Sequence, residues 1–180
     1  FLVQEGIDAA HVSGKQLLEP MARNTAAAMS AVALLADPEQ LLLFAPADHH
    51  IPDPERFVAT ILKGVPAAMA GYLVTFGVEP SFPSTAYGYI RQGEKLDAAL
   101  GEEAGHAVAA FIEKPTADRA EQFLLEGGHL WNAGILLVQA KVLIAALQEH
   151  APDILDSCRL ATATIETDGA FLRMDSAAFS

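Results

Sequence analysis

The chain has 180 residues, a formal net charge of −12 at pH 7 and 52% hydrophobic residues. These values fit a folded chain of domain size and exclude a disordered or low-complexity protein. No apolar run approaches the roughly 20 residues of a membrane-spanning helix, and the acidic surplus argues against binding to nucleic acid or an anionic membrane. The one cysteine, Cys158, excludes an internal disulfide and is expected to be a core residue of a protein in the cytoplasm.

Short apolar runs typical of strands alternate with amphipathic segments typical of helices. In chain order, the expected elements are a strand at 16–18, a helix from 24 or 25 to about 36, a strand at 41–45, a helix from 53, a strand at 72–76, an extended segment at 85–91, a surface turn at 93–105, a strand at 108–113, a helix from 116 or 118 to about 126, a strand at 131–138, a helix at 140–150 and a helix from 152. This alternation predicts an α/β fold, with a mainly parallel or mixed sheet flanked by helices, in a single domain over residues 1–180.

The expected helix from Asp53 has two specific features. Phe57, Ile61 and Leu62 are predicted to face inward, because their spacing follows one side of a helix. Pro66 lacks a backbone N–H, so it is predicted to kink or restart this helix.

Ligands of α/β sheets bind beyond the carboxyl ends of the strands, where several chemically competent residues are expected. Asp48 follows the strand at 41–45, so its carboxylate could hold one Mg²⁺. The alternative is a helix cap, although Asp53 already fills that role. His49 and His50 are adjacent and are expected to point apart, which argues against a paired metal role.

The sequence Glu113-Lys114-Pro115 ends another expected strand. Neighbouring side chains in a strand face opposite ways, so both charges can reach one ligand only if the strand breaks. Pro115 supplies that break and is expected to hold Lys114 extended. A carboxylate that accepts sugar hydroxyls beside an ammonium that pairs with phosphate suits a sugar phosphate. The alternative is an exposed, charged strand end.

Three further clusters carry polar groups that could meet a ligand. Asn132 has the donors and acceptor needed to read a hydroxyl group, whereas the neighbouring Trp131 is better explained by core packing. Gly88 either exposes its backbone N–H to a ligand or marks a bulge. Asn24 and Thr25 stand at a helix start, whose free N–H groups favour a phosphate or a base, but plain helix capping also explains them.

The order of these clusters resembles that of the mannose-1-phosphate guanylyltransferases, a family of sugar nucleotidyltransferases. The segments that carry the resemblance are Glu19-Pro20 with Arg23–Ala26, Pro46–His49, Thr75–Gly77, Tyr87–Ile90, Phe111–Pro115 and Trp131–Gly134. The Glu-Lys-Pro sequence is shared with other sugar nucleotidyltransferases. The Arg-Asn-Thr-Ala and Trp-Asn-x-Gly sequences indicate the mannose family more narrowly.

The resemblance implies a Rossmann-like domain that makes GDP-mannose and pyrophosphate from GTP and mannose 1-phosphate, with Mg²⁺ as cofactor, for polysaccharide biosynthesis. The roles that it implies are Mg²⁺ ligation by Asp48, nucleotide binding by Asn24 and Thr25, sugar binding by Gly88, Glu113 and Asn132, and phosphate binding by Lys114, with Asp48 and Lys114 as the catalytic residues. Positioning two anions and neutralising the growing charge needs no side-chain nucleophile.

The sequence departs from the family pattern in four places. Residues 1–19 contain no match to the family's glycine-rich phosphate loop or to its first strand, and Asp175 comes too early for its second metal-binding Asp. Ala27 replaces a usual Pro, and Ala86 replaces a frequent Gly. We therefore expect an internal portion of an enzyme, incomplete for catalysis as written. Its exposed apolar sheet edge is expected to be covered by another copy or by residues outside this chain.

Three alternatives remain at this point. The enzyme could use another sugar phosphate or another nucleotide. The chain could be a non-catalytic module that binds a sugar phosphate or a nucleotide, since the phosphate loop is missing while Glu113, Lys114 and Asn132 are present. It could also be a structural α/β domain without a ligand.

Overall fold

The computed structural model describes residues 2–101 and 105–179, and the chain divides into two compact units. The terminal unit comprises residues 1–38 and 143–180, and the central unit comprises residues 39–142. The single domain expected over residues 1–180 therefore stays a prediction.

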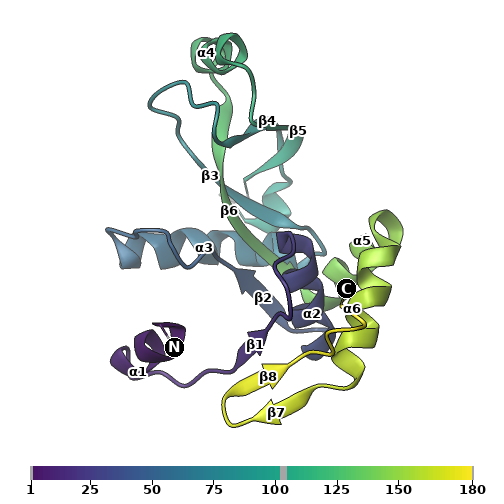
Figure 1. Cartoon of the computed structure of the whole chain (residues 1–180). Helices are drawn as coiled ribbons and strands as arrows, with labels where there is room; N and C mark the ends of the chain where they lie inside the picture. The colour runs from purple at the N-terminus through teal and green to yellow at the C-terminus, as the bar shows by residue number, and fades with distance from the viewer. Residues whose placement is uncertain (1, 102–104, 180) are drawn as a thin grey trace. The chain divides into compact units, whose positions relative to one another are not determined.

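The terminal unit is built from both ends of the chain. Its elements are α1 (Leu2–Ala9), β1 (Gln16–Leu18), α2 (Thr25–Leu35), most of α5 (Ala140–His150), α6 (Pro152–Ala163), β7 (Glu166–Asp168) and β8 (Phe171–Arg173). The strands form a small sheet in the order β1-β8-β7, in which β1 runs parallel to β8. Figure 1 shows these first and last strands of the chain side by side.

The core of the terminal unit lies where α2 packs against α6. Ala31 of α2 and Cys158 and Ala161 of α6 are buried there together with Met174 and Phe179. Small side chains on both helices let the two backbones approach closely. Cys158 is thus a core residue, as predicted, and burial raises the pKa of its thiol above the ordinary value.

The central unit holds a five-stranded sheet around one long strand. Its elements are β2 (Leu41–Phe44), α3 (Pro54–Met69), β3 (Val74–Val78), β4 (Gly88–Lys95), a short 3₁₀ helix η1 (Ala98–Leu100), β5 (His106–Glu113), α4 (Ala117–Glu126) and β6 (His129–Gln139). β6 pairs with β3 along one edge and with β4 and β2 along the other, while β5 pairs with β4 (Figure 1). Of the predicted surface turn at 93–105, residues 102–104 lie outside the described residues, and β4 occupies its beginning.

The α/β class is confirmed, but the expected mainly parallel pairing is wrong for the central unit. Every strand pair described in this sheet is antiparallel. The reason is that β2 and β3, which α3 connects, run in the same direction but are separated by β6, which runs the other way. Hydrophobic periodicity shows that a strand is buried but does not show which strand will insert beside it.

Helix α3 begins as the sequence predicts and continues further than expected. The Asp53 carboxylate accepts a hydrogen bond from the backbone N–H of Arg56 at 2.9 Å, and Pro54 occupies the first turn, where no N–H is required. The prediction that Pro66 restarts the helix is wrong, since one helix runs unbroken to Met69.

The inward face of α3 is narrower than predicted. Ile61 is buried and Phe57 packs against the same cluster, but Leu62 is 61% exposed because it lies about 100° around the helix from Ile61.

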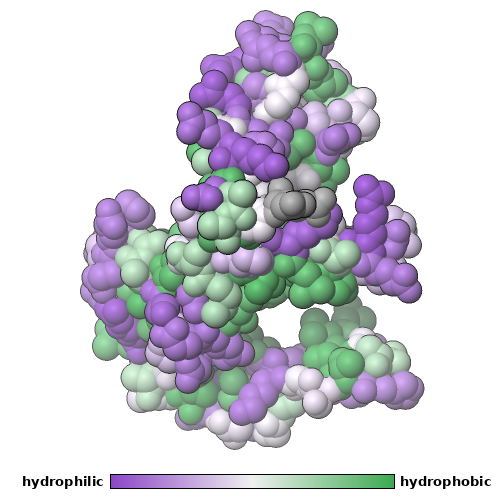
Figure 2. Space-filling model, turned by 180° about the vertical axis from the view of Figure 1, so that it is seen from behind, coloured by the Kyte–Doolittle hydropathy of each residue, from purple (hydrophilic) through white to green (hydrophobic). Residues whose placement is uncertain are grey.

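Leu125 of α4 and Leu160 of α6 are exposed as well, and Figure 2 shows apolar patches among the hydrophilic residues of the visible face.

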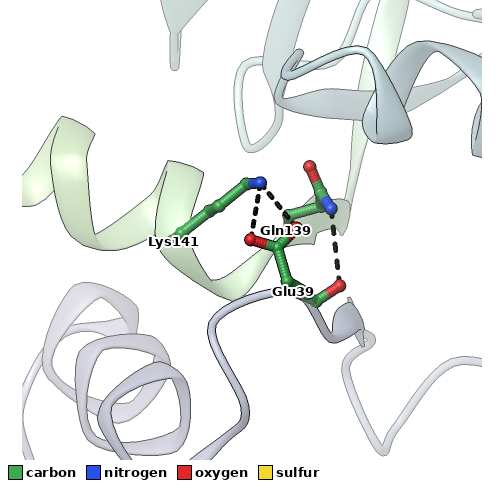
Figure 3. A network of polar contacts seen from close by, with 3 residues as sticks. All are labelled: Glu39, Gln139 and Lys141. Carbon is green, nitrogen blue, oxygen red and sulfur yellow. Dashed lines mark hydrogen bonds and ion pairs between the residues drawn. The ribbon is translucent and has the colours of Figure 1, made fainter.

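Polar contacts join Glu39, which precedes β2, to Gln139 at the end of β6 and to Lys141 in the first turn of α5. The Lys141 ammonium donates to both carboxylate oxygens of Glu39, at 2.8 and 2.6 Å, and the Gln139 side chain donates to the Glu39 backbone carbonyl at 3.4 Å (Figure 3). The ion pair is largely exposed, so it contributes little to stability, about 0–1 kcal/mol.

Both helices of the central unit cover the same face of the sheet. Trp131 of β6 packs under α4, and Ala133 of the same strand packs under α3. Residues two apart on a strand share a face, so the intervening Asn132 belongs to the opposite face. None of the described helices is long and apolar enough to cross a membrane.

Candidate functional site

Four residues from four strands lie in one row across the central sheet. Gly88 of β4 is paired with Glu113 of β5, and Gly77 of β3 is paired with Asn132 of β6. Because Tyr89 is paired with Trp131 in an antiparallel register, Gly88 lies opposite Asn132. The sheet therefore brings the predicted sugar-binding residues Glu113, Gly88 and Asn132 next to one another.

The side chains of Glu113 and Asn132 share the face that α3 and α4 leave uncovered within the central unit. Ile112 packs into the cluster under α4, which turns its neighbour Glu113 to the other face. The same alternation turns Asn132 away from the helix side, where Trp131 packs. A ligand above the row could contact both side chains.

Because Gly88 has no side chain, the Glu113 carboxylate can lie in the space that a Cβ at position 88 would occupy. An ideal Cβ at Gly88 would come within 2.6 Å of Glu113 Oε2 and 3.1 Å of Phe111 Cζ. The pairing of β4 with β5 is regular at Gly88 and shifts only beyond Arg91, so the alternative that Gly88 marks a bulge is wrong. This packing requirement was not predicted from the sequence, because β5 lies more than 20 positions further along the chain.

Lys114 does not have the extended conformation that Pro115 was expected to impose. Its φ is +44°, in the left-handed region, and its backbone N–H donates to the Tyr87 carbonyl at 3.2 Å. This turn at the end of β5 brings the Lys114 Nζ to 3.9 Å from Glu113 Oε1, although consecutive residues of a regular strand point apart. A left-handed conformation costs a residue with a Cβ about 1–2 kcal/mol, and here that strain is located in the candidate site.

The amide of Asn132 has one defined orientation. Its Oδ1 accepts hydrogen bonds from the Thr75 hydroxyl at 3.2 Å and from the Gly134 backbone N–H at 3.1 Å. A backbone N–H can only donate, so the atom that faces Gly134 must be the oxygen. The Nδ2 group consequently points away from both contacts, and the structure gives its two N–H donors no acceptor among the described residues.

Asp48 lies in the turn that follows β2, where its side chain is exposed. It lines a cavity of about 570 Å³ together with Ile61 of α3, Ala133 and Gly77, so this cavity is on the helix side of the sheet and reaches the row only at Gly77. His49 and His50 line the same cavity. Asp53 caps α3, which removes the alternative of a capping role for Asp48.

The residues around Asp48 fit a metal ion that takes only one ligand from the protein and its other ligands from water and substrate. Among the described residues, no group of three His, Cys, Asp or Glu side chains could enclose an ion, and the Asp48 carboxylate has no hydrogen-bond or ion-pair partner. A single exposed carboxylate suits Mg²⁺, which retains several waters and takes further oxygens from substrate phosphates. It would not suit zinc, which requires three or four protein ligands.

Asn24 and Thr25 lie at the start of α2 in the terminal unit. Asn24 is the N-cap, but its side chain makes no capping hydrogen bond, so capping does not account for its amide. Arg23, Asn24 and Cys158 are among the residues that line a cavity of about 290 Å³ within this unit. The central unit thus holds the predicted sugar and metal ligands, and the terminal unit holds the predicted nucleotide ligands.

Trp131 supports the row from the helix side of the sheet. Its ring meets Phe82 and Tyr87 edge to face, with centroids 4.8 and 5.2 Å apart, which confirms the expected packing role. Its indole N–H is buried without a partner among the described residues. The place of Phe82 in this cluster was not predicted from the sequence.

The chain matches the family profile described as nucleotidyl transferase over residues 2–177. It is 40% identical over 168 residues to the mannose-1-phosphate guanylyltransferase of Escherichia coli K12, and this aligned region covers 91% of this chain and 35% of that protein. It is also 40% identical over 183 residues to the alginate biosynthesis protein AlgA of Pseudomonas aeruginosa, covering 99% of this chain and 37% of AlgA. The chain therefore spans about a third of the length of these curated relatives.

Two solved structures share the fold. One, described as mannose-6-phosphate isomerase from Helicobacter pylori, matches with a TM-score of 0.86 and 36% identity over 99% of this chain and 68% of that chain. The other, described as mannose-1-phosphate geranyltransferase from Thermus thermophilus, matches with a TM-score of 0.75 and 28% identity over 98% of this chain and 49% of that chain.

Proposed function

Because the chain belongs to the nucleotidyl transferase family, we propose that the full-length protein transfers the guanylyl group of GTP to mannose 1-phosphate. An oxygen of the sugar phosphate attacks the α-phosphorus of GTP, the bond from that phosphorus to the bridging oxygen breaks, and pyrophosphate leaves as GDP-mannose forms. The observation that carries this proposal is the row of Glu113, Gly88 and Asn132, with the Lys114 ammonium at its end.

The row has the polarity that a carbohydrate requires. A sugar hydroxyl both donates and accepts, and here the Glu113 carboxylate can only accept while the free Nδ2 group of Asn132 can only donate. Two such groups on opposite sides of Gly88 would hold neighbouring hydroxyls in one orientation. The Lys114 ammonium beside them would pair with the phosphate of the sugar phosphate in a charge-assisted contact.

The nucleotide belongs, in this proposal, at the start of α2. The first backbone N–H groups of a helix favour phosphates and base acceptors, and the side-chain amide of Asn24 is not used for capping. Thr25, in the first turn, would border the same nucleotide. These roles rest on the sequence resemblance and on the cavity that Asn24 lines.

Nucleotidyl transferases of this family generally use a divalent metal ion, and we propose Mg²⁺ held by Asp48. The ion, when bound, would neutralise charge on the phosphates during the transfer. Asp48 would hold it in the cavity that its turn lines together with Gly77, the β3 member of the row. Lys114 would supply the second positive charge from the protein itself.

The proposal is tested by incubating the full-length protein with Mg²⁺, GTP and either mannose 1-phosphate or glucose 1-phosphate, and measuring pyrophosphate release. We expect release with mannose 1-phosphate and much slower release with glucose 1-phosphate. Faster turnover of glucose 1-phosphate would show that the enzyme serves another sugar. Calorimetric binding of mannose 1-phosphate without any pyrophosphate release would instead identify a non-catalytic binding module.

The cellular location and assembly belong to the same proposal. A cytoplasmic location agrees with a single, buried cysteine. Among the described residues β2 pairs only with β6, and Leu43 of β2 is 43% exposed, so we propose that another copy covers this strand. Sedimentation of the full-length protein as a monomer at micromolar concentration would contradict the homo-oligomer.

A further inference from the structure

We propose that Thr75 is a positioning residue that determines which way the Asn132 amide points, and thereby the kind of ligand atom that the site accepts. This inference rests on the proposed function, because it assigns Asn132 to the sugar phosphate. Thr75 lies in the Thr-Phe-Gly segment of β3, and its hydroxyl donates to Asn132 Oδ1.

An irregularity in the sheet brings the two residues together. Thr75 is paired with Leu136, but Gly77, two residues further along β3, is paired with Asn132, so β6 carries two extra residues at this point. One of them, Gly134, has a φ of +66° and turns its N–H back to the Asn132 side chain. Bulges of this kind re-aim side chains, and they are frequent beside active sites.

The hydroxyl of Thr75 completes the restraint on the amide. A single bond from the Gly134 N–H would let the amide swing about that contact, whereas a second donor on the same oxygen fixes its plane. The hydroxyl has one hydrogen and lies 3.2 Å from Asn132 Oδ1 but 3.4 Å from the Ile135 carbonyl, so the shorter contact is to the amide. Because Thr75 is β-branched, its χ1 angle is stiff and the hydroxyl is held in place.

The consequence concerns the polarity of the site. With Oδ1 held by two donors, Asn132 presents only N–H groups, so it selects an acceptor oxygen of the ligand. The acceptor-only carboxylate of Glu113 lies across Gly88 from it. If the amide turned over, Asn132 would offer its oxygen instead, and the difference between the two sides of the row would be lost.

The test compares Thr75→Val, which keeps the shape and removes the hydroxyl, with Thr75→Ser, which keeps the hydroxyl. In the full-length enzyme, we expect Thr75→Val to raise KM for mannose 1-phosphate about 5- to 10-fold, with kcat and KM for GTP changed less than twofold. Thr75→Ser should restore KM to within twofold of wild type. Thr162→Val, which removes a hydroxyl bonded only to helix carbonyls of α6, is the matched control and should leave all three constants unchanged.

A double variant shows whether Thr75 acts through Asn132. KM for mannose 1-phosphate should be the same in Thr75→Val/Asn132→Ala as in Asn132→Ala alone. Additive effects, an equal change in KM for GTP, or no change in Thr75→Val would overturn the role of Thr75. If Thr75→Val fails to fold, Thr75→Ala and Thr75→Ser provide the same comparison. Absence of turnover by the wild-type enzyme would contradict the proposed function itself, so the two failures are distinguishable.

Discussion

The Glu113 carboxylate lies in the space that a side chain at Gly88 would fill, with Oε2 only 2.6 Å from an ideal Cβ position. Gly88 is buried, and its strand β4 is held between β5 and β6. A larger side chain at this position could therefore not avoid the carboxylate by turning toward solvent. The glycine is therefore required for the placement of a charged group rather than for a special backbone conformation.

Replacing Gly88 by alanine should damage the sugar side of the site more than the fold. The new methyl group would displace the Glu113 carboxylate, whose free end is flexible, and would press on Phe111 Cζ at 3.1 Å. We expect KM for mannose 1-phosphate to rise at least 10-fold while KM for GTP stays within twofold, measured by pyrophosphate release. Gly6→Ala is the control, because nothing lies within 4 Å of its added Cβ, and it should change neither constant. Unchanged sugar-phosphate kinetics in Gly88→Ala would contradict the role of the row.

Two substitutions of Lys114 separate the effect of its charge on binding from the effect of its backbone strain on stability. Lys114→Gly and Lys114→Ala both remove the ammonium, so both should weaken binding of mannose 1-phosphate alike, with little effect on GTP. Only glycine relieves the φ of +44°, so Lys114→Gly should have a free energy of unfolding about 1 kcal/mol above that of Lys114→Ala. Urea denaturation measures this difference, and equal stabilities would show that the left-handed conformation stores no strain.

Asp48→Asn should abolish the Mg²⁺-dependent turnover and leave the fold intact. The asparagine keeps the size of the side chain, but a neutral amide is a poor Mg²⁺ ligand. Because Asp48 is exposed, we expect the circular dichroism spectrum and the midpoint of thermal unfolding to stay the same. Asp118→Asn, an equally exposed carboxylate in the first turn of α4, serves as the control and should retain full activity. Wild-type turnover in Asp48→Asn would refute the metal assignment.

Gly77→Ala should destabilise the central unit. Its Cβ would come within 2.5 Å of Leu130 Cδ1 and 2.6 Å of Leu130 Cβ, and the latter atom cannot move without the backbone of β6. We expect a loss of about 2 kcal/mol or more in the free energy of unfolding, measured by urea denaturation. Gly14→Ala, whose nearest neighbour would be Ile7 Cδ1 at 3.8 Å, should change stability by less than about 0.5 kcal/mol. A smaller effect in Gly77→Ala than in the control would contradict the packing.

Cys158 should make stability depend on pH in the alkaline range. Burial raises the pKa of its thiol in the folded chain, so above the unfolded pKa the unfolded chain loses a proton that the folded chain keeps. The stability that Cys158 contributes is therefore complete below about pH 8.5 and is lost as the pH rises through the folded pKa. Urea denaturation of wild type and Cys158→Ala between pH 7 and pH 10 measures this effect. The slope with pH should be steeper in the wild type, and equal slopes would contradict the shift.

Most elements of the fold could be predicted because their signals are local. The cap at Asp53, the prolines at 54 and 152 and the apolar runs of β2 and β6 each mark an element within a few residues of its observed bounds. The antiparallel arrangement could not be predicted in this way, since the insertion of β6 between β2 and β3 depends on contacts more than 50 residues apart.

The candidate site could be predicted by residue type but not by conformation. Glu113, Lys114 and Asn132 carry recognisable chemistry, and their convergence follows from the strands that bear them. The left-handed turn at Lys114 was missed because the proline rule describes an average preference, and a hydrogen bond to the Tyr87 carbonyl opposes it here. Thr75 was missed because its partner depends on a bulge that no local pattern indicates.

The hairpin of β4 and β5 has its two ends in very different circumstances. Gly88 and Glu113 form the open end, in the candidate site, while Lys95 and His106 form the end at which the chain connects the two strands, seven residues and about 23 Å away. The connecting segment can therefore lengthen, shorten or acquire new sequence without displacing Gly88 and Glu113.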